Sequence, residues 1–329
     1  MAFKKRRDGV YLKHLPAFRR IFPYLMPTRD ESIIFANQKI NVGPLLAFLE
    51  RINKGRSREE RITFFHCMLA AASRTVRLRP QLNRFVAGRR LYEQKEISIT
   101  FIVKKAMTEE APEAEARVVF TGRERLGEIR DLVNRHIHRA RGDHKGSDDK
   151  LIDFVGGLPR PCLNLVARLI RWLDYHNILP AFFMEAIPLY TSVYLANLGS
   201  IGLDAVYHHL YEFGTASTFA VIGKIHKEPC VDGKNRVVIR DLVNVTFTMD
   251  ERVSEGYYYA RSILLFQTLL EEPWLLERPD LSLAEILAVA GGEHGLKTSG
   301  RTKRAGVRRK QFTARSVRPP GQKESGEKK

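Results

Sequence analysis

The chain of 329 residues has only three cysteines and no long apolar run, and each shortage excludes a class of protein. Cys67, Cys162 and Cys230 are odd in number and far apart, so neither a disulfide framework nor a thiolate metal site is expected. Spanning a bilayer takes about 20 apolar residues, and the most apolar helical stretch is interrupted by Arg168 and Arg171. The basic N-terminus is not followed by an apolar segment, so no signal peptide is indicated. We expect a cytoplasmic protein with no membrane span.

The usual metal and nucleotide motifs are also missing. His136 and His138 are two residues apart on an expected helix, so they face different sides and cannot ligate one metal ion. His66 is next to an apolar helical stripe and is expected to be a hydrogen-bonded core residue. Gly199 and Gly202 lack the third glycine of a dinucleotide site, and no Walker-type loop is present. The sequence predicts no metal site and no covalently bound cofactor.

The chain does carry a large excess of positive charge, with a formal net charge of +18. More than half of this excess lies in residues 297–329, where twelve Lys and Arg oppose two Glu, a net charge of +10. This tail has few apolar residues and several Gly and Pro, so it is expected to be disordered. It is either an electrostatic arm for a polyanion such as RNA, for acidic lipid or for an acidic partner, or a solubilising tail.

The sequence divides into an N-terminal arm over residues 1–40, a folded body over 41–290, and the tail. Three prolines and several aromatic residues in the stretch 4–29 argue against one long helix and favour an extended arm lying on the body. In the body, apolar residues at helical spacing predict a core helix over 62–78, and a charged helix is expected over 126–141.

Strands are indicated by short stretches of alternating or β-branched residues, at 97–103, 117–120, 192–197, 218–223, 236–239 and 243–249. An acidic turn is expected at 109–115 and a polar loop at 142–150. Pro161 begins another helix with apolar residues on one face. Asp232-Gly233 indicates a hairpin between two of the strands.

The most informative stretch is Asp-Glu-Arg-Val-Ser-Glu-Gly at 250–256, which lies after an expected strand and before an expected helix. It resembles the Asp-His-Arg-Val-x-Asp-Gly motif of chloramphenicol acetyltransferases and of the dihydrolipoamide acyltransferases of 2-oxoacid dehydrogenase complexes. Residues 62–83, 195–202 and 219–223 resemble further segments of these families in the same order. The resemblance covers residues 41–273. It implies an α/β fold, the two-layer chloramphenicol acetyltransferase-like sandwich with a mixed sheet.

The resemblance assigns the candidate catalytic carboxylates. Glu251 stands where these families have the histidine that acts as general base, and Glu255 stands where they have an aspartate. Glu251 could replace the imidazole if burial and the neighbouring charge of Glu255 made it more basic. Arg252, or an arginine of the arm, could instead pair with one of the two carboxylates and keep it ionised.

The resemblance also indicates substrate-binding positions at Ala196, Asn197 and Gly256. Ala196 stands where the families have a serine whose hydroxyl is a candidate oxyanion donor, and alanine cannot donate. His209 is a further catalytic candidate, because the His-His-Leu-Tyr-Glu segment at 208–212 is the densest polar and aromatic cluster of the chain. Interface packing or a satisfied surface pair is the alternative for His209. A similar segment in bacterial acyltransferase-like proteins suggests a distinct subfamily.

Two functions remain open at this point. The first is acyl transfer to an unknown acceptor from an acyl-thioester, either acyl-coenzyme A as co-substrate or an acylated carrier, in a homotrimer with active sites between subunits. The second is a catalytically inactive trimeric binding or assembly protein with a polyanion-binding tail. The absent histidine, the absent serine and the +10 tail support the second, and the family resemblance implies the first.

Overall fold

The computed structural model describes residues 5–104, 113–141 and 155–294. The expected polar loop at 142–150, most of the acidic turn at 109–115 and the whole tail at 297–329 lie outside the described residues. Within the described part, no helix is long and apolar enough to cross a membrane.

A six-stranded mixed sheet forms the centre of the fold, in the order β2-β9-β8-β7-β5-β6. β7 pairs in parallel with β5 and β8, and the other pairs are antiparallel. The predicted α/β class with a mixed sheet is therefore confirmed. The strands are β2 (Ile33–Asn41), β5 (Ile97–Lys104), β6 (Glu113–Phe120), β7 (Val193–Asn197), β8 (Thr218–Val231) and β9 (Val237–Asp250).

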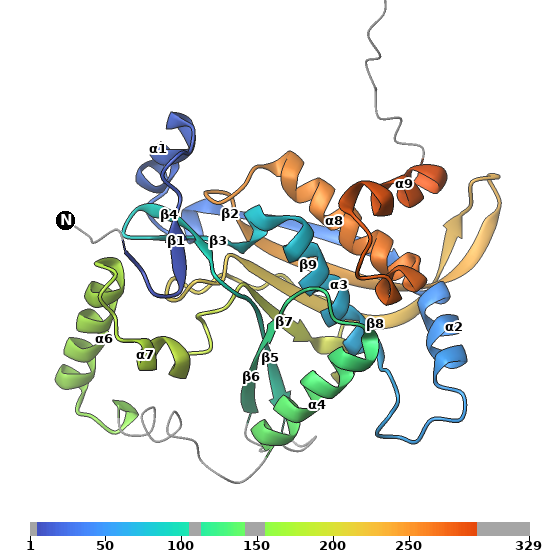
Figure 1. Ribbon diagram of the computed structural model, residues 1–329, viewed down its shortest axis with the longest axis horizontal. Coiled ribbons are helices and arrows are strands. Elements are labelled where there is room, and N and C mark those ends of the chain that lie inside the picture. Colours follow the sequence, from blue (N-terminus) through green and yellow to red (C-terminus); the bar gives the residue numbers. More distant parts are fainter. Residues whose placement is uncertain (1–4, 105–112, 142–154, 295–329) are drawn as a thin grey trace, which may run out of the picture.

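Helices cover one face of this sheet, as Figure 1 shows. β9 buries Val243, Val245, Phe247 and Met249 in the main hydrophobic core, as period-two alternation requires. The core lies between the sheet and the helical layer, which gives the two layers expected from the sequence. The helices are α2 (Gly43–Ile52), α3 (Phe64–Leu78), α4 (Leu126–Arg141), α8 (Gly256–Glu271) and α9 (Leu283–His294), with 3-10 turns at Asp30–Ser32, Pro80–Asn83, Leu198–Ile201 and Pro273–Glu277.

An irregular segment, residues 203–211, crosses the other face of the sheet. The alternate residues of β9 hold it there: Asn244 donates to Asp204 at 2.8 Å and the Thr246 hydroxyl donates to the Val206 carbonyl at 2.6 Å. Thr248 donates to the His208 carbonyl in the same way. The chain between β7 and β8 is therefore tied to this face by side-chain hydrogen bonds.

The N-terminal region is not the extended arm that its prolines predicted. It forms β1 (Gly9–Tyr11) and the helix α1 (Ala17–Leu25), while residues 33–40 belong to the edge strand β2. Pro16 caps the start of α1, where a missing N–H costs little, and Pro23 lies within the helix. β1 pairs with β4 (Arg90–Gln94), which pairs with β3 (Arg84–Ala87) in a small second sheet.

Several other predicted elements can be compared directly. The helix 126–141 has the predicted limits, the core helix begins at Phe64, and Asp232-Gly233 lies in the β8–β9 hairpin. The strands expected at 236–239 and 243–249 form the single strand β9, since the intervening residues keep pairing with β8. Arg160–Tyr175 forms the helix expected at Pro161, named α6, followed by α7 (Ala181–Ala186).

Candidate active site

The motif lies where β9 ends and α8 begins, which confirms the predicted order of strand, motif and helix. Asp250 is the last residue of β9 and is fully buried. Its carboxylate accepts bonds from the Arg252 guanidinium, the shortest at 2.7 Å, and from the Ser32 hydroxyl at 3.1 Å. A buried carboxylate needs such compensation for its lost hydration. This ion pair therefore fixes the shape of the motif turn.

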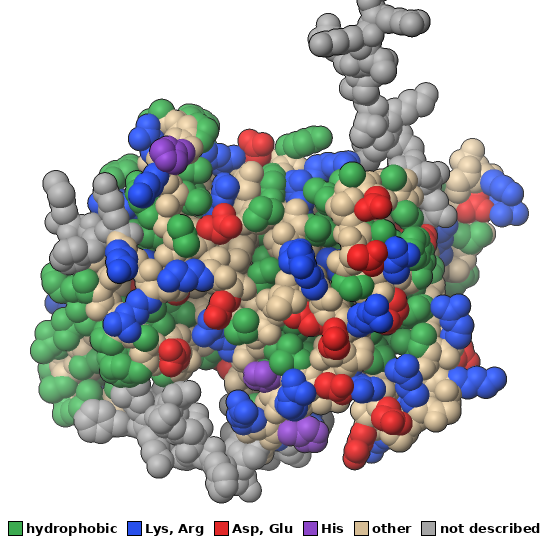
Figure 2. Space-filling view, viewed as in Figure 1, with side chains coloured by type: hydrophobic (Ala, Val, Ile, Leu, Met, Phe, Trp, Pro, Cys, Tyr) green, Lys and Arg blue, Asp and Glu red, His purple; other side chains and the backbone are tan. Residues whose placement is uncertain are grey.

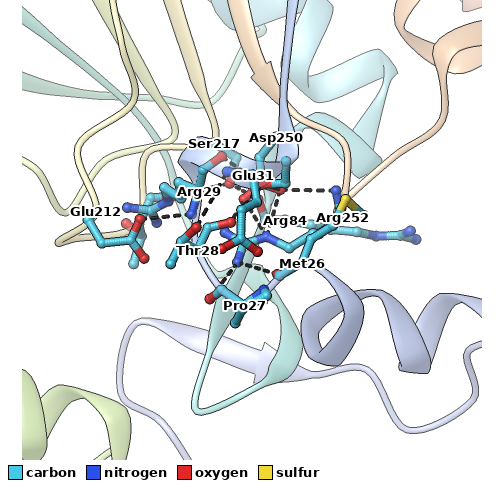
Figure 3. A network of polar contacts seen from close by, with 12 residues as sticks. Met26, Pro27, Thr28, Arg29, Glu31, Arg84, Glu212, Ser217, Asp250 and Arg252 are labelled. Atoms are coloured by element: carbon cyan, nitrogen blue, oxygen red, sulfur yellow. Dashed lines mark hydrogen bonds and ion pairs between the residues drawn. The ribbon is translucent and has the colours of Figure 1, made fainter.

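Three further hydrogen bonds hold Asp250 and Arg252 in place. The buried Tyr259 hydroxyl donates to the Asp250 carbonyl at 2.7 Å. Burial raises the pKa of Tyr259, so its hydroxyl remains a donor. Arg252 also donates to the carbonyls of Met26 and Pro27, at 3.2 and 3.3 Å. As Figure 3 shows, the buried pair thus ties the N-terminal region to the motif.

Arg29 extends this network to the turn before β8. Its guanidinium is buried and donates to the carbonyls of Tyr211 and Phe213 and, at 2.7 Å, of Gly214. Its backbone N–H donates to the Glu212 carboxylate at 2.7 Å, in the contact drawn in Figure 3. Burial lowers the pKa of Arg29, but an arginine remains charged near neutral pH. Residues 211–214 are therefore anchored to the segment that also contacts the motif.

Glu251 is half-buried at the motif turn. Its backbone N–H donates to the Ser32 carbonyl at 2.8 Å, and its own carbonyl accepts from Arg19 at 3.4 Å. Within the described part of the chain its carboxylate makes no hydrogen bond, so the backbone is fixed while the acid group is left available. Glu251 is thus positioned by the 3-10 turn at Asp30–Ser32 and by α1, as well as by the end of β9.

Glu255 is placed differently, because an arginine of the N-terminal region pairs with it. Arg19 of α1 lies 3.2 Å from the Glu255 carboxylate, whose side chain is 64% exposed. Glu255 is the N-cap residue of α8, but its side chain does not accept a capping bond. The pairing between an arm arginine and one of the two carboxylates, left open by the sequence, therefore occurs at Glu255.

The substrate-binding candidates Ala196 and Asn197 end strand β7 and are half-buried. Ala196 packs against a small apolar cluster on the face that carries residues 203–211. The turn after them requires glycine: a Cβ on Gly199 would lie 2.3 Å from the Gly223 carbonyl oxygen. A Cβ on Gly256 would meet no atom within 4 Å, so the packing around this position does not require glycine.

Ala196 and Asn197, at the end of β7, are far from Glu251 within one chain. Ala196 of β7 pairs with Val221 of β8, and Val221 pairs with Thr246 of β9. Ala196 is therefore level with Thr246 and two strands away from it. Thr246 lies five positions before Glu251. Strands rise about 3.3 Å per residue and lie about 4.8 Å apart, which puts the two backbones on the order of 19 Å apart. Within one chain, the structure therefore places Gly256 beside the candidate carboxylates, at the start of α8, and leaves Ala196 and Asn197 apart from them.

The His208-His209 pair lies on the sheet face opposite the helices. The His208 ring stacks on Phe219 with centroids 4.0 Å apart, and His209 stacks on His208 at 4.6 Å. The Tyr211 ring contacts His209 edge-on at 5.0 Å. His209 is exposed at the end of this stack, and neither imidazole contacts Glu251. The cluster is therefore an aromatic stack in this chain.

His66 is buried and its Nδ1 accepts the Thr63 backbone N–H at 3.1 Å, so the predicted hydrogen-bonded core role is confirmed. No group of His, Cys, Asp and Glu suitable for a metal ion occurs in the described ranges. The sequence did not single out Arg19, Arg29 or Ser32. For the two arginines, the only signal in the sequence was the density of basic residues in the arm, and this density does not indicate which arginine contacts the motif.

The sheet order, the helical layer and the motif at the end of β9 define the fold of an acyltransferase catalytic core. Residues 191–277 match the family model of the 2-oxoacid dehydrogenases acyltransferase (catalytic domain). The resemblance found in the sequence is thereby confirmed for the segment that contains Ala196 and Glu251. Among curated proteins none matches the chain.

Solved structures share the fold over most of the chain. A probable dihydrolipoamide acetyltransferase from Listeria monocytogenes 4b F2365 is 14% identical with a TM-score of 0.53, over 83% of this chain and 98% of that one. The Azotobacter vinelandii dihydrolipoamide acetyltransferase is 15% identical with a TM-score of 0.55, over 81% and 94%. The cubic core of a pyruvate dehydrogenase complex is 15% identical with a TM-score of 0.50, over 81% and 94%. At these identities the likeness concerns the fold.

Proposed function

We propose that this protein transfers an acyl group from an acyl-thioester, acyl-coenzyme A or an acylated carrier, within a homotrimer whose active sites lie between chains. The observation that carries the proposal is the separation of the two candidate half-sites, on the order of 19 Å in one chain. A site that uses both Glu251 and the end of β7 can be completed only by a second chain. The match of residues 191–277 to an acyltransferase family supports the reaction class.

Exposed apolar side chains support the association of chains. The β8–β9 hairpin projects from the body in Figure 1, and its Val231, Val237 and Ile239 are 67%, 74% and 63% exposed. Such a patch costs solubility unless a partner covers it. A structural relative is the core of a multienzyme complex, so assembly of this fold has a precedent.

In the proposed reaction, the Glu251 carboxylate removes a proton from the thiol or hydroxyl of the acceptor. The resulting anion attacks the thioester carbonyl, and the tetrahedral intermediate collapses with loss of the donor thiolate. Glu251 then returns its proton to that thiolate, so the carboxylate is regenerated. The carboxylate is suited to this role because it makes no hydrogen bond within residues 5–104, 113–141 and 155–294, while its backbone is held on both sides.

The intermediate also requires a donor for its oxyanion. Ala196 has no hydroxyl, and a missing oxyanion donor costs a factor of about one hundred to one thousand in rate. The neighbouring Asn197 carboxamide is half-buried and makes no hydrogen bond to the described residues, so it is the proposed donor. Asn197 would donate to the oxyanion of a thioester that is attacked by the acceptor deprotonated by Glu251 of the adjacent chain.

A second function has its own support, namely a catalytically inactive trimeric binding protein. Two features depart from a working acid-base site. Ala196 lacks a hydroxyl donor, and the Glu255 carboxylate is paired with Arg19. In this alternative, the +10 tail would bind a polyanion while the fold provides assembly.

The first experiment measures release of coenzyme A from a series of acyl-coenzyme A donors with a thiol acceptor. We expect Glu251→Gln to reduce turnover by about one hundredfold or more and to leave the trimer mass in light scattering unchanged. Glu59→Gln, an exposed carboxylate in a loop, is the matched control and should retain full turnover. Equal turnover of Glu251→Gln and the parent would remove Glu251 from the mechanism, and a monomer mass at micromolar concentration would remove the shared site.

The second experiment separates a weak enzyme from an inactive scaffold. Glu251→His combined with Ala196→Ser restores the base and the hydroxyl of the resembling families. A general base contributes about two to four orders of magnitude, so the double variant should exceed the parent measurably if the scaffold binds the donor. If neither protein binds or cleaves an acyl-thioester, the inactive binding protein is the correct account.

A further inference from the structure

α6 is a sixteen-residue helix in which no residue is buried. It lies at the edge of the molecule in Figure 1, packed with α7 beside the small sheet. Ile170 and Leu173 on its inner side contact the cluster of Leu179, Met184 and Tyr190. The helix is therefore attached along one side, while the rest of its surface faces solvent.

The outward side of α6 carries a ridge of large apolar residues. Leu165, Leu169 and Trp172 are spaced three and four apart, so they share one side of the helix, and they are 69%, 51% and 54% exposed. Phe182 of α7, 55% exposed, and Ile178, 40% exposed, add to the apolar surface. Figure 2 shows hydrophobic side chains gathered at this edge of the molecule. A soluble helix rarely exposes so many large apolar residues without a partner.

The polar side of α6 is positively charged. Arg160, Arg168 and Arg171 are exposed and form no ion pair with any described residue. The only acidic residue of the helix, Asp174, is neutralised by Arg6 at 2.8 Å. An apolar ridge with tryptophan, bordered by unpaired arginines, is the pattern of a helix that lies in a membrane interface.

We propose that α6 docks the protein on an anionic phospholipid surface, with Leu165, Leu169 and Trp172 inserted among the acyl chains and Arg168 and Arg171 paired with lipid phosphates. One partner then covers both the apolar ridge and the arginines of α6. The lipid phosphates pair with the arginines, and the acyl chains just below the headgroups cover the ridge. The net charge of +18 favours approach to such a surface.

A second copy of the chain fits this surface less well. An isologous contact between two α6 helices would bring the three unpaired arginines of each copy together, and like charges oppose such a contact. The proposed trimer uses other surfaces, at the motif and the β8–β9 hairpin. The lipid inference is independent of whether the proposed acyl transfer is correct.

Trp172 provides a local reporter for the test. The chain has two tryptophans, so Trp274→Phe leaves Trp172 as the only one in the full-length protein. We expect bromine-labelled lipids in phosphatidylglycerol vesicles to quench Trp172 fluorescence, and phosphatidylcholine vesicles to quench it much less. Binding through the basic tail alone would not bring Trp172 within reach of the bromine atoms.

Leu165→Glu with Leu169→Glu places charges on the ridge and should weaken vesicle partitioning about tenfold or more. Val119→Glu, a comparable change at an exposed valine of β6, is the matched control and should bind as the parent does. Unchanged melting temperatures establish that both variants fold. Absence of Trp172 quenching, or unchanged partitioning of the double variant, would overturn the proposal. Self-association without lipid that the double variant abolishes would overturn it too, in favour of a second copy.

Discussion

Mixed trimers test the proposed shared site most sharply. Glu251→Gln removes the proposed base and Asn197→Ala removes the proposed oxyanion donor, and each variant alone is expected to lose turnover. Asn197 is level with Val245, six positions before Glu251 and two strands away, so the two backbones are about 22 Å apart within a chain. A working site would therefore take Glu251 from one chain and Asn197 from its neighbour. A mixed trimer can therefore contain intact sites although every one of its chains is defective.

The expected recovery follows from random assembly. When equal amounts of the two variants are refolded together, each interface has a one-half chance of an intact Glu251 and a one-half chance of an intact Asn197. About one quarter of the sites are then complete, so turnover should return to about one quarter of the parent value. The assay is coenzyme A release before and after joint refolding. Turnover that stays at the level of the separate variants, in trimers shown to be mixed, would refute the idea of a site between chains.

The remaining predictions concern the scaffold and the tail. Arg252→Met leaves Asp250 buried and unpaired, so it should lower the free energy of unfolding by about 3–5 kcal/mol in urea titrations; a loss below about 1 kcal/mol would show that Asp250 is compensated elsewhere. Burial lowers the pKa of His66 from its usual 6.5, so the unfolded chain binds a proton at this residue more readily than the folded chain does. The contribution of neutral His66 to the free energy of unfolding is therefore complete above pH 6.5 and is lost as the pH falls below it. His66→Gln should make that part of the acid dependence disappear from thermal melts between pH 7 and 5, and an unaltered dependence would assign it to other groups. Removing residues 297–329 should leave the melting temperature unchanged and weaken RNA binding at low salt, whereas salt-insensitive binding would contradict an electrostatic arm.

The arginines of the N-terminal region show where sequence reasoning stops. The proline content of the arm argued for an extended chain, yet Pro16 and Pro23 are accommodated in the short helix α1. Arg19 of that helix contacts Glu255, which is 236 residues away in sequence, and Arg29 contacts carbonyls 182 to 185 residues away. Neither composition nor periodicity carries information over such separations, so the sequence could state that some arginine pairs with the motif but not which one.

The sequence by itself determined the parts of this protein that depend on local pattern. The charged stretch 126–141 predicted the limits of α4, alternation predicted the buried side of β9, and the family motif located the strand-to-helix turn that holds Glu251. Only the tertiary structure decided which groups meet there. The pairing register places Ala196 level with Thr246, and the buried Asp250–Arg252 pair couples the turn to the N-terminal region. The physical reason is that strand order, register and long-range ion pairs are set by packing of the whole chain, while helices, strands and turns follow from the residues within them.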